Sequence, residues 1–421
     1  MRVLILSHTT GYQLRAFNDA AESCGIALLF ATDRCHKLDD PWQDHAVAVR
    51  FHELDASVAA IVHAAEHQPI GGIIAVGDRP VPLAARAARA LRIPWHTVAG
   101  ATASADKRSS RKVLAAAGLP SPQFATFRAA ERDMRTAGAV GFPCVVKPLG
   151  LSGSRGVIRA DDQQQFSNAV WRIRALLGRP QIRAARAGLE DEILVEEFIP
   201  GREFALEGVM TAGALTTFAI FDKPDPLDGP FFEETVYVTP SRAGAPVEGA
   251  IVTAVTDAAR ALGLRHGPVH AECRVNDSGV YVLEVAARPI GGLCSRVLTF
   301  VGRTAGTASL ERVLLEHAIG GSTADWFREP KAAAVMMIPI PRRGVLKRVG
   351  GEDEARAVDG IVDIRITAKL DQLLEPLPEA GSYLGFVFAR GASPERAERS
   401  VRDAHDRLTF DIQKEIAVRP A

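Results

Sequence analysis

The strongest chemical signal in the sequence is a lysine followed by a loop of glycines and serines, in the segment FPCVVKPLGLSGSRGV. An apolar strand would end at Lys147, and the loop after it would bring backbone N–H groups and hydroxyls together. Glycines allow that convergence and the lysine adds a point charge, so the segment suits a bound phosphate. The lysine stands before the glycines, unlike in a P-loop, and a surface turn with a solvated lysine is the alternative interpretation. The loop residues that could contact phosphate are Ser152, Gly153, Ser154 and Gly156.

A second segment, EEFIPGRE, follows further along the chain and has the parts of a nucleoside site. Adenine needs a carboxylate or carbonyl for its amino group and apolar walls for its ring, and a ribose needs an acceptor for its hydroxyls. Glu196 and Glu197 would end one strand, and Glu203 would open the next. Phe198 and Ile199 lie between them as the apolar wall. An ordinary hairpin with surface glutamates is the alternative.

Glu272 and Glu284 each interrupt an apolar strand pattern, VHAECRV in one case and VYVLEVAA in the other. The turn sequence NDSG joins the two patterns, so adjacent antiparallel strands would place both carboxylates on one face of a sheet. Carboxylates together with phosphate oxygens are the ligands that Mg²⁺ prefers, and Mn²⁺ accepts the same set. Arg288 follows shortly after Glu284 and is suited to hold a carboxylate or a developing oxyanion. A purely structural ion pair between Glu284 and Arg288 is the alternative.

The elements that position these residues can be read from the spacing of apolar residues. Up to residue 99, strand patterns such as VLIL, ALLFAT and GGIIAVGD alternate with helical stretches, which predicts a parallel sheet covered by helices. One helix is expected over 101–117, carrying Lys107, and another over 252–262. After Pro330 the strand patterns VMMIPI, VDIRIT and YLGFVFAR precede a final amphipathic helix expected over 394–416.

Composition excludes several classes of partner. The 421 residues are 47% hydrophobic and 24% charged, and 50 Lys and Arg balance 50 Asp and Glu. Such a balance gives no electrostatic footprint for nucleic acid or for an anionic membrane. There is no uninterrupted apolar run long enough for a membrane span, and the cysteines form no CxxC pair, so we expect a soluble cytoplasmic protein with free thiols. The cysteines are Cys24, Cys35, Cys144, Cys273 and Cys294.

In this order, Lys107, the lysine with its glycine/serine loop, the EEFIPGRE connector, the two glutamates and Arg288 resemble the ATP-grasp superfamily, over most of the chain. The resemblance implies an α/β fold in which a Rossmann-like domain precedes two lobes that clasp ATP, followed by a small lid. The implied modules are the Rossmann-like domain over 1–100, lobe A with its linker helix over 101–199, lobe B with the metal site over 200–325 and the C-terminal lid over 326–421.

The functional positions of the family can be carried over to matching residues of this sequence. Glu196 corresponds to the adenine-binding connector, Glu203 to the ribose acceptor, and Lys223 is expected to reach the γ-phosphate. The implied Mg²⁺ ligands are Glu272 and Glu284, and the implied catalytic residues are Arg288, Lys147 and Glu284. The positions implied to bind ATP are Lys107, Lys147, Ser152, Gly153, Ser154, Gly156, Glu196, Glu197, Phe198, Ile199, Glu203 and Lys223.

The sequence after Glu284 departs from that of many family members and points to one subgroup of the family. Many members have Glu-x-Asn where this chain has Glu284-Val285-Ala286, so the Asn that completes the second metal site is missing. The sequence EVAAR, and the pattern His-x-Glu at His270, are similar to the L-amino-acid ligases that make dipeptides such as bacilysin. The residues expected on the substrate side are His270, Arg288, Gly291 and Glu233. Glu234 is the alternative for Glu233, and a polar core position is the alternative for His270.

The resemblance implies an ADP-forming ligase that joins a carboxylate to an amine through an acyl phosphate. ATP and Mg²⁺ are the implied cofactors, amino acids are the expected acid and amine substrates, and the family suggests a homodimer. Three alternatives stay open. The chain could be a purine-biosynthesis-like ligase, a carboxylase-like enzyme that uses bicarbonate, or a nucleotide-binding regulator without catalysis.

Overall fold

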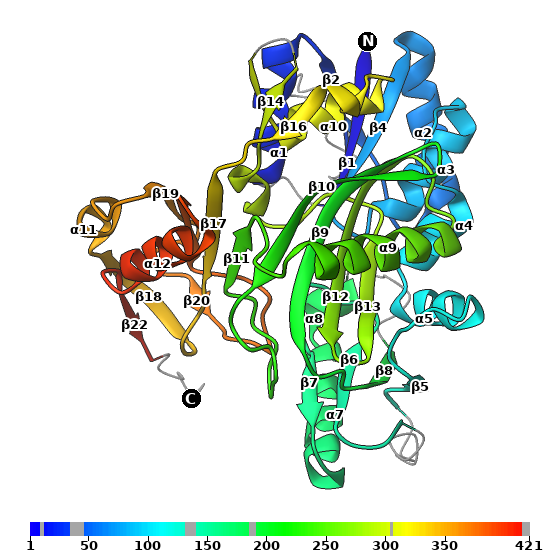
Figure 1. The fold of residues 1–421 in the computed structure, drawn as a ribbon. Helices are drawn as coiled ribbons and strands as arrows, with labels where there is room; N and C mark the ends of the chain where they lie inside the picture. Colours follow the sequence, from blue (N-terminus) through cyan, green and yellow to red (C-terminus); the bar gives the residue numbers. More distant parts are fainter. Residues whose placement is uncertain (9–11, 34–45, 131–139, 185–190, 304–305, 415–421) are drawn as a thin grey trace, which may run out of the picture.

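The computed structural model describes residues 1–8, 12–33, 46–130, 140–184, 191–303 and 306–414. Within these residues the strands form five sheets, and the chain runs from a first helix-covered sheet through a large central sheet to a last helix beside it (Figure 1). The four cysteines in the described ranges are free thiols, and Cys35 lies outside those ranges. None of the helices described here combines the length and the apolar character that crossing a membrane requires.

The first module is a parallel sheet with the strand order β3-β2-β1-β4, as the alternating strand and helix patterns predict. Strand β1 is buried on both faces: Leu4 and Leu6 pack in one core cluster, and Val3 and Ile5 pack in another. A parallel strand covered by helices on both faces is expected to be apolar throughout in this way. The elements are β1 (Arg2–Ser7), α1 (Tyr12–Cys24), β2 (Ala27–Thr32), β3 (Ala46–Ala48), α2 (Leu54–His67), β4 (Ile70–Val76) and α3 (Val81–Leu91).

The single linker helix expected over 101–117 is wrong, because the segment forms two helices, α4 (Val98–Ser104) and α5 (Lys107–Ala116). The break falls at Asp106, whose carboxylate accepts a hydrogen bond from the backbone N–H of Arg108 at 3.0 Å and caps α5. A capping residue has non-helical dihedral angles, so a helix starts after it and does not run through it. Lys107 is therefore the first residue of α5.

Lobe A is a four-stranded antiparallel sheet with the order β5-β8-β6-β7, covered by helix α7. Phe166 and Ile173 of that helix pack on Val146 and Val195 of the sheet. Lys147 of β6 and Glu196 of β8 line a cavity that is described below. The elements are β5 (Phe124–Arg128), β6 (Cys144–Pro148), β7 (Ile158–Ala160), α7 (Gln163–Leu177), α8 (Pro180–Ala184) and β8 (Glu192–Glu197).

The central sheet has eight strands in the order β13-β12-β9-β10-β11-β17-β21-β19. Phe204 and Leu206 of β9 pack with α9, which lies across one face of the sheet in Figure 1. Because side chains alternate along a strand, Glu203 and Glu207 point to the opposite face. The elements are β9 (Arg202–Thr211), β10 (Ala214–Lys223), β11 (Val236–Thr239), α9 (Ala245–Leu262), β12 (Gly267–Asn276), β13 (Gly279–Ala286), β17 (Ala332–Ile338), β19 (Ile361–Ile366) and β21 (Gly385–Gly391).

The central sheet contains strands from both sides of residue 325, where the boundary between lobe B and the lid is expected. Strand β17 pairs with β11 from Val236↔Met336 to Thr239↔Ala333, so backbone hydrogen bonds join the two predicted modules. Between them lie η1 (Cys294–Val297), β14 (Thr299–Gly302), β15 (Thr307–Ser309), α10 (Leu310–Ala318), η2 (Thr323–Asp325) and β16 (Trp326–Arg328).

The final helix expected over 394–416 is too long. Helix α12 (Pro394–His405) ends at the C-cap Asp406, and β22 (Thr409–Gln413) follows and pairs with β18 (Gly344–Gly350). The alternating sequence TFDIQ suits a half-buried strand better than a helix, and residues 415 and 416 lie outside the described ranges. The remaining elements are α11 (Glu352–Arg356) and β20 (Leu373–Leu374).

A buried histidine joins the first module to the central sheet. The Nε2 atom of His96 lies 3.1 Å from the carbonyl oxygen of Pro268, and Nδ1 accepts a hydrogen bond from the backbone N–H of Arg265 at 3.1 Å. These two bonds require a neutral ring with its proton on Nε2. Burial lowers the pKa of His96 from 6.5 to about 3.

Acid should therefore destabilise the fold through His96. Its pKa in the folded chain lies below 6.5, so the stabilisation is complete above pH 6.5 and is lost as the pH falls toward 3. Between pH 7 and pH 5 the difference in free energy of unfolding between wild type and His96→Gln should shrink by about 2 kcal/mol. Urea unfolding at each pH measures it, with exposed His67→Gln as the control. A pH-independent difference would contradict the assignment.

Candidate active site

One face of the central sheet carries charged side chains from four neighbouring strands, β9, β10, β12 and β13. In the β9–β12 ladder Glu203 pairs with Arg274 and Glu207 with His270, and in the β9–β10 ladder Glu203 also pairs with Lys223. In the β12–β13 ladder Glu272 lies directly opposite Glu284. Residues opposite each other in an antiparallel pair share a face, so the expectation that these two carboxylates face the same side is confirmed.

Lys223 lies at the centre of three carboxylates. Its Nζ atom is 2.8 Å from Glu203, 2.6 Å from Glu234 and 3.1 Å from Glu272. Burial opposes the charged lysine, but these carboxylates outweigh it and raise the pKa of Lys223 well above its ordinary value. Burial also raises the pKa of Glu234 to about 7, against the opposing charge of Lys223. The three carboxylates thus share Lys223 as the cation that offsets their negative charge.

The same carboxylates are the candidate metal ligands. Oxygen atoms of Glu203, Glu234 and Glu272 lie within 4.8 Å of one another. Glu284 lies across the ladder from Glu272, with its Oε2 atom 3.8 Å from Nζ of Lys107. Hard oxygen donors that remain about a quarter exposed, as Glu272 and Glu284 do, fit a Mg²⁺ ion that keeps part of its water and phosphate ligands.

The glycine/serine loop and its lysines meet these carboxylates from lobe A. Nζ of Lys107 lies 3.4 Å from the carbonyl oxygen of Leu151, and Ser152, Gly153 and Ser154 line the cavity. Burial opposes the charge on Lys107, but Glu284 and the other nearby acids raise its pKa.

Gly156 does not line the cavity and serves packing instead. Its N–H donates to the carbonyl oxygen of Pro378 at 2.8 Å, so it is not available to a phosphate. Its φ of +75° suits glycine, and a Cβ atom there would lie 2.9 Å from the ring of Pro148. The expectation that Gly156 contacts phosphate is therefore wrong.

Glu196 is a buried anchor between modules. Its carboxylate is 2.7 Å from Nε of Arg111 and 2.5 Å from Nζ of Lys147. Burial disfavours its charge, yet the two cations lower the pKa of Glu196. Arg111 also donates to the carbonyl oxygen of Leu283. Because its carboxylate is already bound by two cations, we expect the Glu196 side chain to position Lys147, and we expect an adenine ring to meet the connector backbone.

The other residues of the connector line the cavity as expected, namely Glu197, Phe198, Ile199 and Glu203. Arg274 holds them together: it donates to Glu203 at 2.9 Å and to the carbonyl oxygen of Ile199 at 2.8 Å, and its guanidinium lies 5.0 Å from the centre of the Phe198 ring. The sequence interpretation missed Arg274. The alternation of HAECRV could have found it, because Arg274 is two residues beyond Glu272 and shares its face.

His270 lines the cavity and is bound to a second residue that the sequence interpretation missed. Its Nδ1 atom lies 3.1 Å from Glu207, which also accepts a hydrogen bond from the backbone N–H of Ile290 at 3.1 Å. Burial opposes a charged ring, but hydrogen bonds to Glu207 and Glu272 raise the pKa of His270 to about 9. Burial raises the pKa of Glu207. Glu207 follows Glu203 at a spacing of four, which predicts the same face of a strand.

Arg288 pairs with an acid of the first module and not with Glu284. Its Nε atom lies 2.6 Å from Oδ1 of Asp78, and its Nη2 atom lies 3.4 Å from Oδ2. Asp78 follows β4, and the carboxyl ends of parallel strands are where α/β sheets bind ligands, which is the signal that could have found it. Gly291 also lines the cavity. Of the two acids expected near a substrate, Glu234 lines the cavity and Glu233 does not, so the choice of Glu233 is corrected to its alternative Glu234.

Most of these residues line one cavity of about 580 Å³, and the C-terminal part of the chain forms part of its wall. Gly381, Ser382 and Tyr383 contribute to its wall. The neighbouring residue Glu379 accepts hydrogen bonds at 2.8 Å from Arg155, at its backbone carbonyl, and at 2.9 Å from Arg172, at its side chain. The glycine/serine loop is thereby fastened to the C-terminal segment over the cavity.

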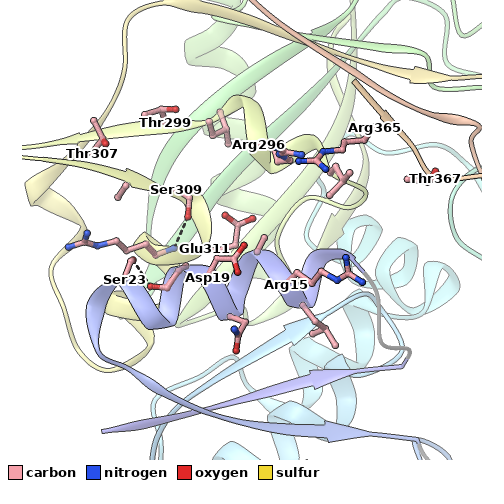
Figure 2. Close-up of a pocket in the computed structure, with 18 of the residues that line it drawn as sticks. Arg15, Asp19, Ser23, Arg296, Thr299, Thr307, Ser309, Glu311, Arg365 and Thr367 are labelled. Carbon is pink, nitrogen blue, oxygen red and sulfur yellow. Dashed lines mark hydrogen bonds between the residues drawn. The ribbon is translucent and has the colours of Figure 1, made fainter. Parts of the chain in front are cut away.

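A larger cavity of about 1430 Å³ lies elsewhere, between α1, η1, α10 and the end of β19 (Figure 2). Arg296 and Arg365 face each other there and both bind Asp363, at 3.0 and 2.7 Å. It contains none of the residues singled out from the sequence. Size alone therefore does not locate the chemistry, and the smaller cavity is the candidate active site.

Three family models match parts of the chain. The ATP-grasp domain family matches residues 140–297, the ATP-grasp N-terminal domain family matches 18–95, and the family described as L-amino acid ligase C-terminal domain 2 matches 336–413. A D-alanine–D-alanine ligase of Methylibium petroleiphilum is 30% identical over 250 residues, which are 56% of this chain and 73% of that protein. The chain belongs to the ATP-grasp family of ATP-dependent ligases.

Two further proteins resemble the chain over more of its length. An uncharacterised protein of Sinorhizobium fredii is 25% identical over 373 residues, covering 85% of this chain and 72% of that one. The crystal structure of an L-amino acid ligase from Bacillus licheniformis superposes with a TM-score of 0.77 at 24% identity, covering 98% of this chain and 99% of that one. The second likeness confirms the α/β ATP-grasp fold with its N-terminal domain and C-terminal subdomain.

The Glu196 anchor can be tested without any substrate. Arg111→Met leaves a buried carboxylate with one cation in place of two, which should lower the free energy of unfolding by about 3 kcal/mol. The control is Lys112→Met, which removes the same charge from an exposed position on the same helix and should change little. Urea unfolding compares the two variants. Equal, small effects would show that Arg111 does not support Glu196.

Proposed function

We propose that the chain is an ADP-forming carboxylate–amine ligase that makes an amide bond between amino acids through an acyl phosphate. The observation that carries the proposal is the set of groups in one cavity: the cross-strand acids Glu272 and Glu284, a lysine beside each, and Arg288 nearby. Two relatives reported above support it, since they are named as ligases of amino acids.

ATP would lie between lobe A and the central sheet. Lys107, Lys147 and the N–H groups at Gly153 and Ser154 offset the phosphate charge, and the apolar side chains of Phe198 and Ile199 face the base. Glu272 and Glu284 would hold Mg²⁺, which supplies charge neutralisation for the transferred phosphoryl group. Lys223, which is bound to three carboxylates, would have to turn from them to reach the γ-phosphate, and the flexible stem of a lysine allows such a movement.

The acid substrate would lie with its carboxylate at Arg288, aimed at the γ-phosphorus. One carboxylate oxygen attacks that phosphorus and the bond to ADP breaks, giving an acyl phosphate. The amine then attacks the acyl carbon, and the C–O bond to phosphate breaks as phosphate leaves. Arg288 stabilises the oxyanion of the intermediate between these events. The C-terminal segment excludes water, which would otherwise hydrolyse the acyl phosphate.

The direct test is ADP and phosphate release from MgATP, screened over amino acids singly and in pairs, with the condensed product identified by mass. ADP formed with particular pairs, together with a peptide, is the expected result. ADP formed with bicarbonate alone would favour the carboxylase-like alternative. Release of AMP would overturn the acyl-phosphate route.

Removing one metal ligand should stop the reaction and spare the fold. Glu284→Gln keeps the shape of the side chain but loses the charge, and turnover should fall by about 1,000-fold or more, because phosphoryl transfer depends on positioning and charge. The control is Glu354→Gln on the exposed face of α11, which should keep full activity. ADP release at saturating Mg²⁺ decides the matter, and substantial turnover by Glu284→Gln would exclude it as a ligand.

Loosening the closure should uncouple ATP use from product. Arg172→Ala removes the side-chain link between α7 and Glu379, the residue whose backbone carbonyl also binds Arg155 of the glycine/serine loop. Water should then reach the acyl phosphate, so the ratio of ADP to product should rise several-fold above one. The control is Arg183→Ala on α8, whose ion pair with Asp191 lies away from the cavity. An unchanged ratio would mean that this link does not protect the intermediate.

A further inference from the structure

The carboxylates that line the active-site cavity differ in the partner that neutralises each of them. Lysines, Arg111 or Arg274 hold most of them, and Glu197 accepts a backbone N–H from Gln123 at 3.4 Å. The acids held by those cations are Glu196, Glu203, Glu234, Glu272 and Glu284. Asp78 differs from them, because its partner Arg288 is the candidate for binding the carboxylate of the acid substrate.

Arg288 keeps free hydrogen-bond donors while it holds Asp78. A guanidinium has five N–H groups. Within the described part of the chain, Nε and Nη2 each use one on Asp78, and Nη1 uses one on the carbonyl oxygen of Pro289 at 3.0 Å. One N–H is left on each Nη atom, which is the arrangement that binds a carboxylate at two points.

Asp78 likewise keeps acceptor capacity and its charge. A carboxylate can accept about four hydrogen bonds, and Asp78 accepts one from Arg288 at each oxygen. Burial opposes its ionisation, but Arg288 and Lys107 lower the pKa of Asp78. An ionised carboxylate beside a guanidinium with free donors therefore presents a negative and a positive group side by side to the cavity.

We propose, resting on the function proposed above, that Asp78 and Arg288 together select an α-amino acid in its zwitterionic form as the acid substrate. Arg288 binds the carboxylate and Asp78 accepts hydrogen bonds from the α-ammonium group. An α-amino acid carries these two charges on adjacent carbons, as the pair requires. An acid without the amino group brings a second negative charge beside Asp78 and leaves that carboxylate without its ligand.

The pair also explains why an acid of the first module reaches this cavity at all. Asp78 comes directly after Gly77, whose φ of +88° turns the chain at the end of β4. An ion pair that only joined the two modules could lie outside the cavity, but Asp78 and Arg288 both line it. Buried polar groups that discriminate by hydrogen bonding reject ligands that leave them unpaired far more strongly than apolar walls do.

The test uses hydroxylamine as the amine, so that only the choice of acid is measured. Hydroxamate and ADP are followed with matched acids that differ in the α-amino group: L-alanine and propionate, L-leucine and isocaproate, L-phenylalanine and hydrocinnamate. The wild type should prefer the amino acid of a pair by at least about 100-fold in kcat/KM. Asp78→Asn, which keeps the shape of the side chain, should lose most of that preference by losing activity with the amino acid and keeping activity with its partner.

The outcomes separate this inference from the function on which it rests. ADP formed equally well with both members of each pair would overturn the zwitterion assignment and leave the ligase assignment standing. An equal loss with both acids in Asp78→Asn would show that Asp78 only positions Arg288, which also overturns it. No ADP or hydroxamate with any acid would overturn the ligase assignment itself. Asp55→Asn, at an exposed position, and thermal unfolding of each variant control for folding.

Discussion

Neutralising charge on a largely buried face of the central sheet is the constraint on which the rest of the site depends. Four neighbouring strands place charged side chains on this face, and like charges directly opposite each other in a ladder are destabilising. Glu272 and Glu284 are such a pair. The structure neutralises them with Lys223 from β10 and Lys107 from the linker, so cations from two different elements make the acidic pair tolerable.

The same constraint couples the modules to one another. Arg288 joins the central sheet to the first module through Asp78, Arg111 joins the linker to lobe A through Glu196, and Arg172 joins lobe A to the C-terminal segment. Each link has one charged partner in or beside the cavity. A ligand that binds one of these charged groups therefore changes the contact between two modules. Binding of ATP or of an acid would be transmitted across the molecule in this way.

Much of this arrangement was predictable because it rests on short periodic patterns. The β1, β2 and β4 strands follow from apolar runs, and the hairpin that brings Glu272 opposite Glu284 and the loop after Lys147 follow from alternation and turn residues. The capping role of Asp106 was missed because the apolar pattern runs through it, and the final helix was extended into β22 because a short alternating strand follows it directly. Propensity cannot decide such boundaries without the partner strand.

The partners of the charged residues were the least predictable part. Asp78 and Arg288 are far apart in the chain, and nothing in either neighbourhood indicates the other. Of the adjacent acids Glu233 and Glu234, Glu234 lines the cavity, because one residue of register decides which of the two side chains faces it. Arg274 and Glu207 could have been found from strand alternation, but only once β9 and β12 were known to be neighbours. Such pairings depend on which strands are neighbours in the sheet, and a single sequence does not specify the strand order.

The central claim, activation of a carboxylate by phosphoryl transfer in this cavity, can be tested by isotope transfer. Amino acids labelled with ¹⁸O in the carboxylate are incubated with the protein, MgATP and an amine, and the released phosphate is examined by mass spectrometry. The account predicts that the phosphate carries one ¹⁸O atom from the carboxylate, since that oxygen becomes the bridge of the acyl phosphate. Product formed with unlabelled phosphate, or label found in AMP, would contradict it.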